Sequence, residues 1–416
     1  MRQILHLLIV DAPGGTALVA HYGTRWLLPV LTCAERARAD PLAVRWAADR
    51  GVSCDVVGQW LGRVNAQGTD WLMVLNAVGL PRKADSQLRR TALLALEPAC
   101  AALEYQGWAL AQALRDGPLP SMRGPFGRFG WLDDVKAWMA PILGPVSSTA
   151  FSHLRSSPHE VVLRARTGRA DLYVKGLTSE RVAEARLTQA MASVIPEHFA
   201  PTIALDERAD RSVWWAAGAC PGRAAIEGDR VASQLAAVQQ RVMAQPLIRC
   251  ELRKLEFAAA LRWCSELLSG AACGALLERQ VHHAMTASVP QSWIPMDLDP
   301  TNLLVDERGT ARFIDLDDSF LGPAPLAMAL FAKRMRSRRS VACTASGSLY
   351  EGYEQSWSPP LPDVAWPAFE AAATLLEAWL GWQRLERNRR SGQVHGASGF
   401  AETRIRDRLT RCVHLL

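Results

Sequence analysis

The chain has 416 residues, of which 49% are hydrophobic and 21% are charged, and it carries a formal net charge of +6. These proportions are ordinary for a globular protein, and they exclude a disordered or fibrous chain. Domains commonly contain about 150 residues, so the length predicts two or three of them. A charge of +6 on a chain of this length does not by itself require a polyanionic partner.

Segments that would direct the chain to a membrane or out of the cell are not expected. The apolar run at residues 4–10 follows a single Arg2 and lacks a small-residue cleavage site. No stretch reaches the roughly 18 apolar residues of a membrane span. The nine cysteines are scattered without a C-x-x-C pair, which is typical of reduced thiols and not of a zinc site. We expect a cytoplasmic protein with no membrane partner.

The densest basic cluster, KRMRSRR, lies at residues 333–339. Clusters of this kind are most often solvated faces of helices. We therefore expect no nucleic-acid partner. The sequence leaves the oligomeric state open.

Residues 1–80 predict a small α/β domain. Apolar runs bounded by turn signals predict one helix between strands. The helix is expected over residues 41–50, because its apolar positions have helical spacing and Gly51 follows it. The predicted strands are residues 4–10, 17–21, 26–31, 56–64 and 71–75.

Residues 81–120 predict a helical connector. Apolar residues at helix-like spacing predict a helix from Asp85 to Leu114, and Pro/Gly-rich segments follow it up to residue 127. We place a domain boundary near residue 120. A short amphipathic helix is predicted over residues 131–143.

Beyond this boundary the predicted elements change from mixed to mainly helical. Strands are expected at residues 161–166, 170–175 and 211–217, with a helix over residues 179–193. The rest of the chain is predicted to be largely helical, apart from short apolar strands at 303–305 and 311–314. No internal repeat is present.

The strongest functional signal is a pair of acidic segments. Residues 297–305 read DLDPTNLLV and residues 312–318 read RFIDLDD. Phosphoryl transfer needs a carboxylate beside the attacking hydroxyl, with an amide oxygen and a second carboxylate that hold magnesium against the phosphates. Asp297, Asn302 and Asp315 supply these groups. The alternative is an acidic hairpin in which the same side chains only form turns and caps.

The two segments resemble the H-G-D-x-H-P-x-N and hydrophobic-I-D-x-D motifs of the aminoglycoside phosphotransferases and choline kinases, which belong to the kinase-like superfamily. The resemblance implies that Asp297 positions or deprotonates the acceptor hydroxyl. It also implies that Asn302 and Asp315 bind Mg²⁺, with Asp317 as a second acidic residue nearby.

The sequence departs from the family pattern at two positions. Pro295 stands where the family has a histidine that braces the backbone, and Asp299 replaces the second histidine. Neither change removes a proposed catalytic group.

An ordered set of weaker matches lies upstream. Lys175 ends a predicted apolar strand and resembles the family lysine that touches the α- and β-phosphates of ATP. Glu184, nine residues later on the predicted helix, resembles the glutamate that pairs with that lysine.

Two further segments resemble parts of a nucleotide site. The turn at residues 155–159, which includes Ser156 and Ser157, is expected to cover the phosphates, although no G-x-G-x-x-G precedes Lys175. The strand that ends at Ala217 resembles the segment between the two lobes, whose backbone meets adenine.

The first domain resembles a Nudix fold in its order of strands and helix. Nudix pyrophosphatases need a helix with an R-E-x-x-E-E core that binds metal, whereas residues 43–51 read AVRWAADRG. We therefore expect a non-catalytic module that serves packing or recognition.

Together these resemblances imply an α+β fold, in which a Nudix-like domain and a connector precede a two-lobed kinase-like domain. The N-lobe is predicted at residues 121–222, and the C-lobe, with the acceptor site, at residues 223–416. The implied activity is transfer of the ATP γ-phosphate, with Mg²⁺, to a hydroxyl of a small molecule that resembles an antibiotic or natural product.

Two alternatives stay open. One is a kinase that acts on peptide or protein hydroxyls. The other is a pseudokinase that only binds nucleotide, which is suggested by Pro295, the degenerate Nudix helix and the absent glycine loop. A Nudix-type hydrolase is disfavoured by the missing glutamates. Glu377 and Glu386 could contact a cationic acceptor, although solvated helix positions are their more common role. The choice between ATP and GTP is also open.

Overall fold

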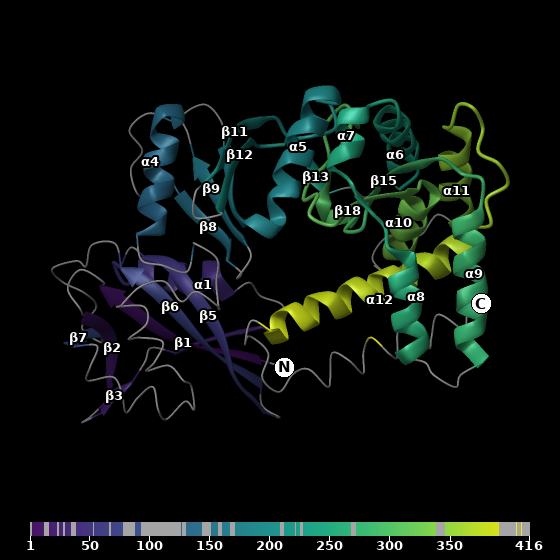
Figure 1. Ribbon diagram of the computed structural model, residues 1–416. Helices are drawn as coiled ribbons and strands as arrows, with labels where there is room; N and C mark the ends of the chain where they lie inside the picture. The colour runs from purple at the N-terminus through teal and green to yellow at the C-terminus, as the bar shows by residue number, and fades with distance from the viewer. Residues whose placement is uncertain are drawn as a thin grey trace. The chain divides into compact units, whose positions relative to one another are not determined.

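The computed structural model in Figure 1 divides into two compact units. The first contains Met1–Glu180, Ala204–Ala216 and Arg387–Ser398, and the second contains Arg181–Ile203, Ala217–Glu386 and Gly399–Leu416. The structure describes residues 2–11, 16–22, 25–27, 30–34, 39–52, 54–65, 68–77, 88–92, 126, 130–143, 151–156, 160–166, 171–208, 212–220, 222–224, 228–267, 272–337, 346–390, 405 and 409.

A seven-stranded mixed sheet begins the first unit. Its order is β3-β2-β1-β6-β5, with β4 paired to β1 and β7 paired to β2. Strand β1 is parallel to β6, and the pairings β1–β2, β1–β4, β2–β3, β2–β7 and β5–β6 are antiparallel. The strands are β1 (Arg2–Asp11), β2 (Thr16–Tyr22), β3 (Arg25–Leu27), β4 (Val30–Ala34), β5 (Cys54–Asn65), β6 (Gly68–Ala77) and β7 (Leu88–Ala92).

One helix covers a face of this sheet. Helix α1 (Ala39–Ala48) presents Ala43 and Ala47, which lie four residues apart and therefore on one side of the helix. They pack against alternate residues of β1, including Leu7 and Ile9, which are fully buried. Alternation along the strand thus supplies one apolar face, and the helix buries it.

The predicted strands and helix of this region are confirmed, except that one predicted strand is divided into two and one further predicted helix is wrong in part. The run at 26–31 forms parts of two strands, β3 and β4. The helix predicted from Asp85 is wrong at Leu88–Ala92, which pairs antiparallel with β2 as strand β7. Pairing with a neighbouring strand outweighs local helix propensity here. Residues 93–125, which hold the rest of that helix and most of the linker, lie outside the described residues.

A five-stranded sheet with the order β11-β12-β10-β9-β8 follows, with a hydrophobic cluster of its own. Helix α4 (Trp131–Leu143) packs on it through Trp131, Val135 and Met139, which are spaced four residues apart on one face. Trp131 stacks on Trp214 with ring centroids 6.2 Å apart. The strands are β8 (Phe151–Ser156), β9 (Glu160–Arg166), β10 (Asp171–Thr178), β11 (Thr202–Glu207) and β12 (Ser212–Gly218).

The predictions for this region hold for α4, β9, β10 and β12. Strands β8 and β11 were not predicted, because neither has a long apolar run. The predicted helix at 179–193 begins as a short 3-10 turn, Ser179–Arg181, and continues as α5 (Val182–Val194). The domain boundaries predicted from the sequence stay predictions.

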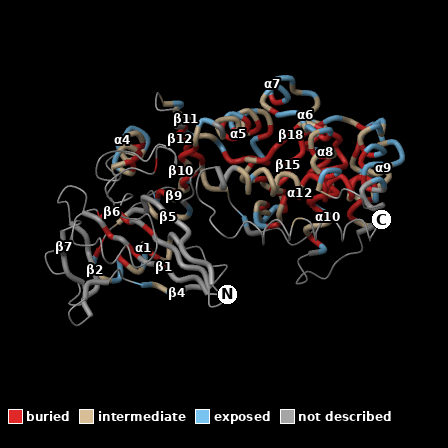
Figure 2. The backbone as a smooth tube through the Cα atoms, turned by 60° about the horizontal axis from the view of Figure 1, so that its bottom comes forward, coloured by how far each residue is buried: buried red, intermediate tan, exposed pale blue. Residues whose placement is uncertain are grey.

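The second unit is mainly helical. Figure 2 shows buried residues along β15, α10 and α12, where fully buried side chains include Trp293, Phe331 and Phe369. Its helices are α5, α6 (Gly228–Met243), α7 (Pro246–Glu251), α8 (Phe257–Leu267), α9 (Ala272–Thr286), α10 (Pro325–Ser337), α11 (Ser346–Gln355) and α12 (Trp366–Arg390). Within the described ranges, no helix has both the length and the hydropathy that a membrane span requires.

Two small sheets interrupt these helices. One has the order β13-β16-β17 and the other β14-β18-β15. The short strands predicted at 303–305 and 311–314 are confirmed as β16 and β17. The strands are β13 (Arg223–Ala224), β14 (Arg253–Lys254), β15 (Gln291–Pro295), β16 (Leu303–Val305), β17 (Ala311–Phe313) and β18 (Ser319–Pro323).

The hairpin of β16 and β17 is fastened to α6. Gln234 donates from Nε2 to the Gly309 carbonyl (2.8 Å) and accepts at Oε1 from the Ala311 amide (2.7 Å). Arg230 donates to the Arg308 carbonyl (3.2 Å). Gly309 has a φ of 79°, a conformation that glycine adopts without strain. The turn is thereby fixed from one side by a helix.

Candidate active site

Asp297 lies just beyond the end of β15. Because β15 runs antiparallel to β18, with Pro295 opposite Ser319, the residues after β15 lie beside the residues before β18. The Met296 amide donates to the Asp318 carbonyl (2.7 Å) and fixes this arrangement. The topology therefore brings the two acidic segments of the sequence to one edge of a sheet.

Asn302 contacts Asp297 directly. Its Nδ2 donates to Asp297 Oδ2 (3.0 Å) and to the Asp297 carbonyl (3.0 Å). A side-chain amide that donates through nitrogen keeps its oxygen as an acceptor, which is the atom that a hard cation binds. The five-residue spacing thus joins a carboxylate to an amide oxygen within one loop.

Asp299 has a structural role in the same loop. It is the N-cap of the 3-10 turn Pro300–Asn302, and its Oδ1 accepts from the Thr301 amide (2.8 Å) and hydroxyl (2.6 Å). Pro300 begins the turn, where a missing N–H has no cost. Asp299 therefore holds Asn302 in place through the backbone.

Asp315 adopts an unusual backbone conformation. Its φ of 63° is the only positive value outside glycine among the described residues. Aspartate tolerates this region better than most residues, and such strain gathers at functional sites. The Ile314 amide donates to the Asn302 carbonyl (3.0 Å), so the residue before Asp315 is tied to the Asn302 loop.

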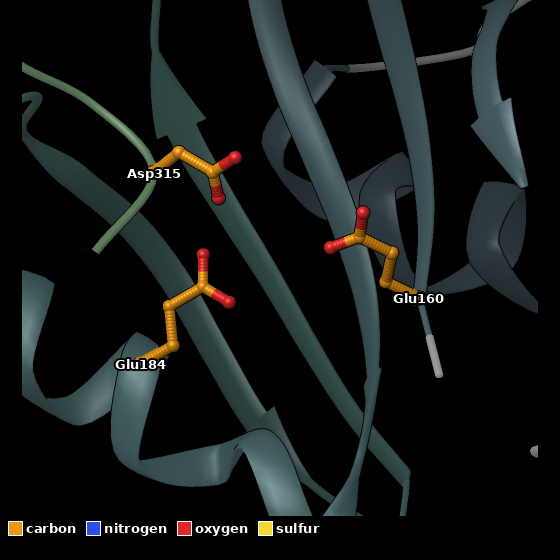
Figure 3. Close-up of side chains that lie close together, drawn as sticks. All are labelled: Glu160, Glu184 and Asp315. Carbon is orange, nitrogen blue, oxygen red and sulfur yellow. The ribbon is translucent and has the colours of Figure 1, made fainter. Parts of the chain in front are cut away.

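Glu184 extends from α5 toward Asp315 (Figure 3). Carboxylate oxygens of the two residues lie within 4.8 Å of one another, and Glu184 is 2% exposed. Two carboxylates this close repel each other unless a cation offsets their charge. An oxygen donor set of carboxylates and an amide suits Mg²⁺ or Ca²⁺, so the residues fit the expected ion.

Arg181 connects Glu184 to Asp317. Its Nη2 donates to Glu184 Oε2 (2.9 Å) and its Nε donates to Asp317 Oδ1 (2.7 Å). The Arg181 side chain is 9% exposed. Sequence reasoning missed this residue, because no local pattern joins positions that are 136 residues apart. One oxygen of Asp317 is therefore already engaged by a cation from this chain.

The adjacent carboxylate, Asp318, also pairs with arginines. Arg384 of α12 donates to Asp318 Oδ2, and Arg253 of β14 lies 4.0 Å from Oδ1. These ion pairs attach the acidic segment to two elements that are distant in the sequence.

Lys175 belongs to the first unit. Strand β10 continues to Thr178, so Lys175 lies inside the strand. The prediction that Lys175 ends this strand is therefore wrong. Its Nζ lies 5.5 Å from the centroid of the Trp215 ring. The pairing predicted between Lys175 and Glu184 stays a prediction. Figure 3 also labels Glu160, the fully buried first residue of β9, whose carboxylate is 2.6 Å from Arg155 Nε.

The remaining predicted nucleotide contacts are partly described. Arg155 and Ser156 end strand β8 and do not belong to the turn in which they were predicted, because β8 pairs with β9 as far as Ser156. Ser157 lies outside the described residues. Ala217 is a buried residue of β12, and the next residue, Gly218, donates its amide to the Pro201 carbonyl (3.0 Å).

Helix α10 contributes a residue that sequence reasoning missed. Arg334 donates to Asp297 Oδ1 (3.0 Å), to the Met296 carbonyl (2.6 Å) and to Glu377 Oε1 (3.1 Å). Lys333 donates to Glu377 Oε2 (2.7 Å). The expectation of a solvated basic face is therefore wrong at the start of the 333–339 cluster.

Glu377 is likewise not a solvated helix residue. Burial would raise its pKa, but Lys333 and Arg334 outweigh burial and hold the pKa below its ordinary value. Glu377 thus stays ionised at neutral pH and is neutralised by two cations of the chain. Glu386, the other glutamate considered for a cationic acceptor, is partly buried on α12.

Comparison with solved structures identifies the fold. No protein-family model matches the chain, and no curated protein matches its sequence. A Ralstonia eutropha protein provisionally described as an aminoglycoside phosphotransferase is 12% identical, with 68% of this chain and 97% of that chain covered and a TM-score of 0.50. The amicoumacin kinase hAmiN, solved with AMP-PNP and Ca²⁺, is 10% identical over 67% of this chain and 93% of its own, also with a TM-score of 0.50.

The choline kinase LicA from Streptococcus pneumoniae is 13% identical, with 68% of this chain and 99% of that chain covered and a TM-score of 0.49. At these identities the likeness is one of fold. The α+β fold expected from the sequence is therefore confirmed, and the Ralstonia eutropha protein and the amicoumacin kinase share it. The Nudix-like nature of the first domain gains no support from them and stays a prediction.

Proposed function

We propose that this chain transfers the γ-phosphate of ATP to a hydroxyl group of a small molecule. The observation that carries the proposal is the set of contacts made by Asn302. Its side chain donates to Asp297, and its carbonyl accepts from the amide of Ile314, the residue before Asp315. These are the group types, in the chain order, that phosphoryl transfer requires. The fold supports the proposal, since amicoumacin kinase shares it and was solved with an ATP analogue.

Asp297 would act on the acceptor. Its carboxylate accepts the hydroxyl proton while the acceptor oxygen uses a lone pair to bond to the γ-phosphorus. The bond between that phosphorus and the β,γ-bridging oxygen breaks, and its electron pair leaves with ADP. The products are ADP, the phosphorylated acceptor and a proton, which Asp297 returns to solvent. The 43% exposure of the Asp297 side chain allows an acceptor to reach it.

Asn302, Asp315 and Asp317 would hold magnesium, with Glu184 as a further carboxylate near Asp315. Bound Mg²⁺ supplies positive charge that offsets the phosphate oxygens. Because Arg181 engages Oδ1 of Asp317, we assign the principal ligation to Asn302 and Asp315. The strained backbone of Asp315 would set the direction of its carboxylate.

The first unit would contribute to nucleotide binding. We propose that Lys175 contacts the phosphates, paired with Glu184, that Ser156 and Ser157 cover them, and that the backbone at Ala217 meets adenine. The unit's N-terminal sheet is proposed as a non-catalytic, Nudix-like module, since α1 reads ADPLAVRWAA and contains no glutamate.

The proposed setting is the cytoplasm, with small-molecule acceptors and no nucleic-acid or membrane partner. The described cysteines Cys54, Cys220, Cys250 and Cys264 are reduced and form no disulfide, which is typical of a reducing compartment.

Nucleotide binding and turnover test the function directly. We expect the wild type to bind Mg²⁺·ATP and to hydrolyse it slowly with water as acceptor. Asp297→Asn should lower kcat by about 10²–10⁴-fold, because the proton acceptor is lost. Asp315→Asn should weaken metal-dependent nucleotide binding, since one anionic ligand is removed. Calorimetric titration and phosphate release measure the two effects.

Asp363→Asn is the matched control, because Asp363 is an exposed carboxylate in a loop. It should leave both measurements unchanged. A wild type that binds neither ATP nor GTP contradicts the proposal. Binding without any turnover would favour the nucleotide-binding pseudokinase, and efficient labelling of peptides over small alcohols would favour a protein-directed kinase.

A further inference from the structure

We infer that Arg334 is a positioning residue that fixes the carboxylate and the backbone of Asp297 for catalysis. The inference rests on the proposed function of Asp297. It assigns a specific task to a residue of helix α10, 37 positions beyond the residue on which it acts.

Each nitrogen of the Arg334 guanidinium has a different acceptor. Nη1 donates to Asp297 Oδ1 (3.0 Å), Nη2 donates to the Met296 carbonyl (2.6 Å) and Nε donates to Glu377 Oε1 (3.1 Å). A planar guanidinium presents these donors at fixed angles, whereas an ammonium group is a single point charge. The three bonds therefore define the direction of the Asp297 carboxylate relative to α10 and α12.

The Asp297 carboxylate is held from both sides. Asn302 Nδ2 donates to Oδ2 at 3.0 Å, and Arg334 donates to Oδ1 at 3.0 Å. One donor comes from the same loop, and the other comes from a helix. Rotation of the carboxylate would break one of the two bonds, so a single orientation is preferred.

The backbone before Asp297 is held in the same way. The Met296 amide donates to the Asp318 carbonyl, and the Met296 carbonyl accepts from Arg334. Pro295, immediately before, has no side-chain donor and no amide N–H. The hydrogen bond that holds the Met296 carbonyl therefore comes from Arg334, a residue of another element.

Arg334 is itself firmly anchored. Its side chain is 19% exposed, and that of its partner Glu377 is 12% exposed. Lys333 also bonds to Glu377 (2.7 Å) and to Thr374 (2.8 Å), which places a second cation on the same carboxylate. The preceding turns of α10, residues 326–332, are buried in the core of the second unit. The guanidinium is thus presented by a rigid part of the fold.

The test compares Arg334→Met, Arg334→Lys and Glu377→Gln with the wild type, using Mg²⁺·ATP and water as acceptor. We expect Arg334→Met to lower kcat by about 10²-fold, the effect of a misplaced reacting group, with the Kd of Mg²⁺·ATP unchanged. Arg334→Lys should recover only part of the loss. Glu377→Gln should cause a smaller fall in kcat, because Arg334 keeps its bonds to Asp297 and Met296.

Arg336→Met is the matched control. Arg336 lies two residues along α10 and pairs with Glu370 (2.9 Å), away from Asp297. Its substitution should leave kcat and Kd at the wild-type values. Free guanidinium ion should restore part of the activity of Arg334→Ala, which a merely structural defect would not allow.

Three outcomes overturn the inference while the proposed function stands. The first is that Arg334→Met keeps the wild-type kcat and Tm. The second is that Arg334→Met loses kcat and nucleotide binding equally and has a lowered Tm, and the third is that guanidinium ion fails to restore the activity of Arg334→Ala. If Arg334→Met does not fold, an unchanged kcat in Glu377→Gln and in Arg334→Lys overturns it. A wild type without Mg²⁺-dependent ATP hydrolysis overturns the proposed function itself.

Discussion

Single polar side chains organise the edges of the candidate site. Arg181 and Arg334 each bond to two carboxylates that come from different elements. Removal of one partner from a buried ion pair leaves an uncompensated charge, which costs more than the pair contributes. These arginines are therefore points at which one substitution disturbs several segments.

His198 is a buried group of another kind, and it makes stability depend on pH. Its Nδ1 lies 2.7 Å from the Ala311 carbonyl, and its own carbonyl accepts from the Phe313 amide. Burial lowers the pKa of His198, and Arg241 and Arg312 act in the same direction, whereas the bond to Ala311 and the charge of Glu197 oppose them. The net result is a pKa below the ordinary value of 6.5.

The sign of the effect follows from this depressed pKa. Below about pH 6.5 the unfolded chain takes up a proton at His198 more readily than the folded chain does, so stability falls as pH falls. His198→Asn, which keeps a donor for the Ala311 carbonyl, should make the fall of Tm between pH 7.5 and 5 smaller. Thermal unfolding across this range measures it. The control is His283→Asn on the exposed side of α9. An identical pH dependence of Tm in His198→Asn and in the wild type would contradict the assignment of this effect to His198.

The proximity of the candidate catalytic residues was predictable because their spacing is local, and their catalytic role stays a prediction. Asp297 and Asn302 lie in one loop, and Asp315 follows the next hairpin, so the motif contains the whole arrangement. Arg181 and Arg334 were not predictable, since their partners Asp317 and Asp297 lie 136 and 37 residues away and only the folded chain brings them together. The residue types of a charged helix face do not reveal which charges are buried.

Strand β10 shows how tightly one element can be packed. Gly176 lies beside Trp214, Phe126 and Val161, and a β-carbon built on it would come within 2.5 Å, 2.7 Å and 2.8 Å of their side chains. These contacts are closer than real side-chain carbons approach, and all three neighbours belong to one buried cluster. The absence of a side chain at this position is therefore a packing requirement of the sheet next to Lys175.

Two glycine substitutions should change stability in opposite directions. Gly176→Ala should destabilise the protein by about 1–3 kcal/mol, because it overpacks a filled core. Gly381→Ala, in helix α12, should stabilise it by about 0.5–1 kcal/mol, because a β-carbon there meets nothing within 4 Å and alanine favours a helix. Urea unfolding followed by tryptophan fluorescence measures both. Equal effects of the two changes would contradict this packing argument.

Elements with strong periodicity were predicted well, and elements that depend on a neighbour were not. The apolar positions of α4 lie four residues apart, and its predicted bounds are those observed. Strand β7 contains two arginines, and β8 and β11 have few consecutive apolar residues. Their strand conformation comes from pairing with β2, β9 and β12, which local patterns do not encode.

Across the second unit, a single glutamine joins segments that are far apart in the sequence. Gln239 of α6 is fully buried, and its Nε2 donates to the carbonyls of Trp293 (2.8 Å) and Ala324 (3.1 Å). Its Oε1 accepts from the Tyr353 hydroxyl (2.6 Å). Strand β15, the residue before α10 and helix α11 therefore meet at one side chain.

Loss of this junction should lower the stability of the whole unit. Gln239→Met keeps the approximate volume but leaves two carbonyls and a hydroxyl without their partner, at about 1–3 kcal/mol for each buried group. We expect Gln239→Met to lower the free energy of unfolding by about 3 kcal/mol or more in total. Tyr353→Phe, which affects only Gln239 Oε1, should lower it by less, and urea unfolding measures both changes. A Gln239→Met protein as stable as Tyr353→Phe would show that the junction is unimportant.

The fastening of the β16–β17 hairpin to α6 limits how the candidate site can open. Gln234 holds the Gly309 carbonyl and the Ala311 amide, and a β-carbon at Gly309 would collide with the Arg230 guanidinium. The strand that follows Asn302 and the strand that precedes Asp315 are therefore parts of one cooperative unit with α6. Their amide protons should exchange with solvent only when the helix itself unfolds, so this hairpin should keep its conformation when a ligand binds at the candidate site.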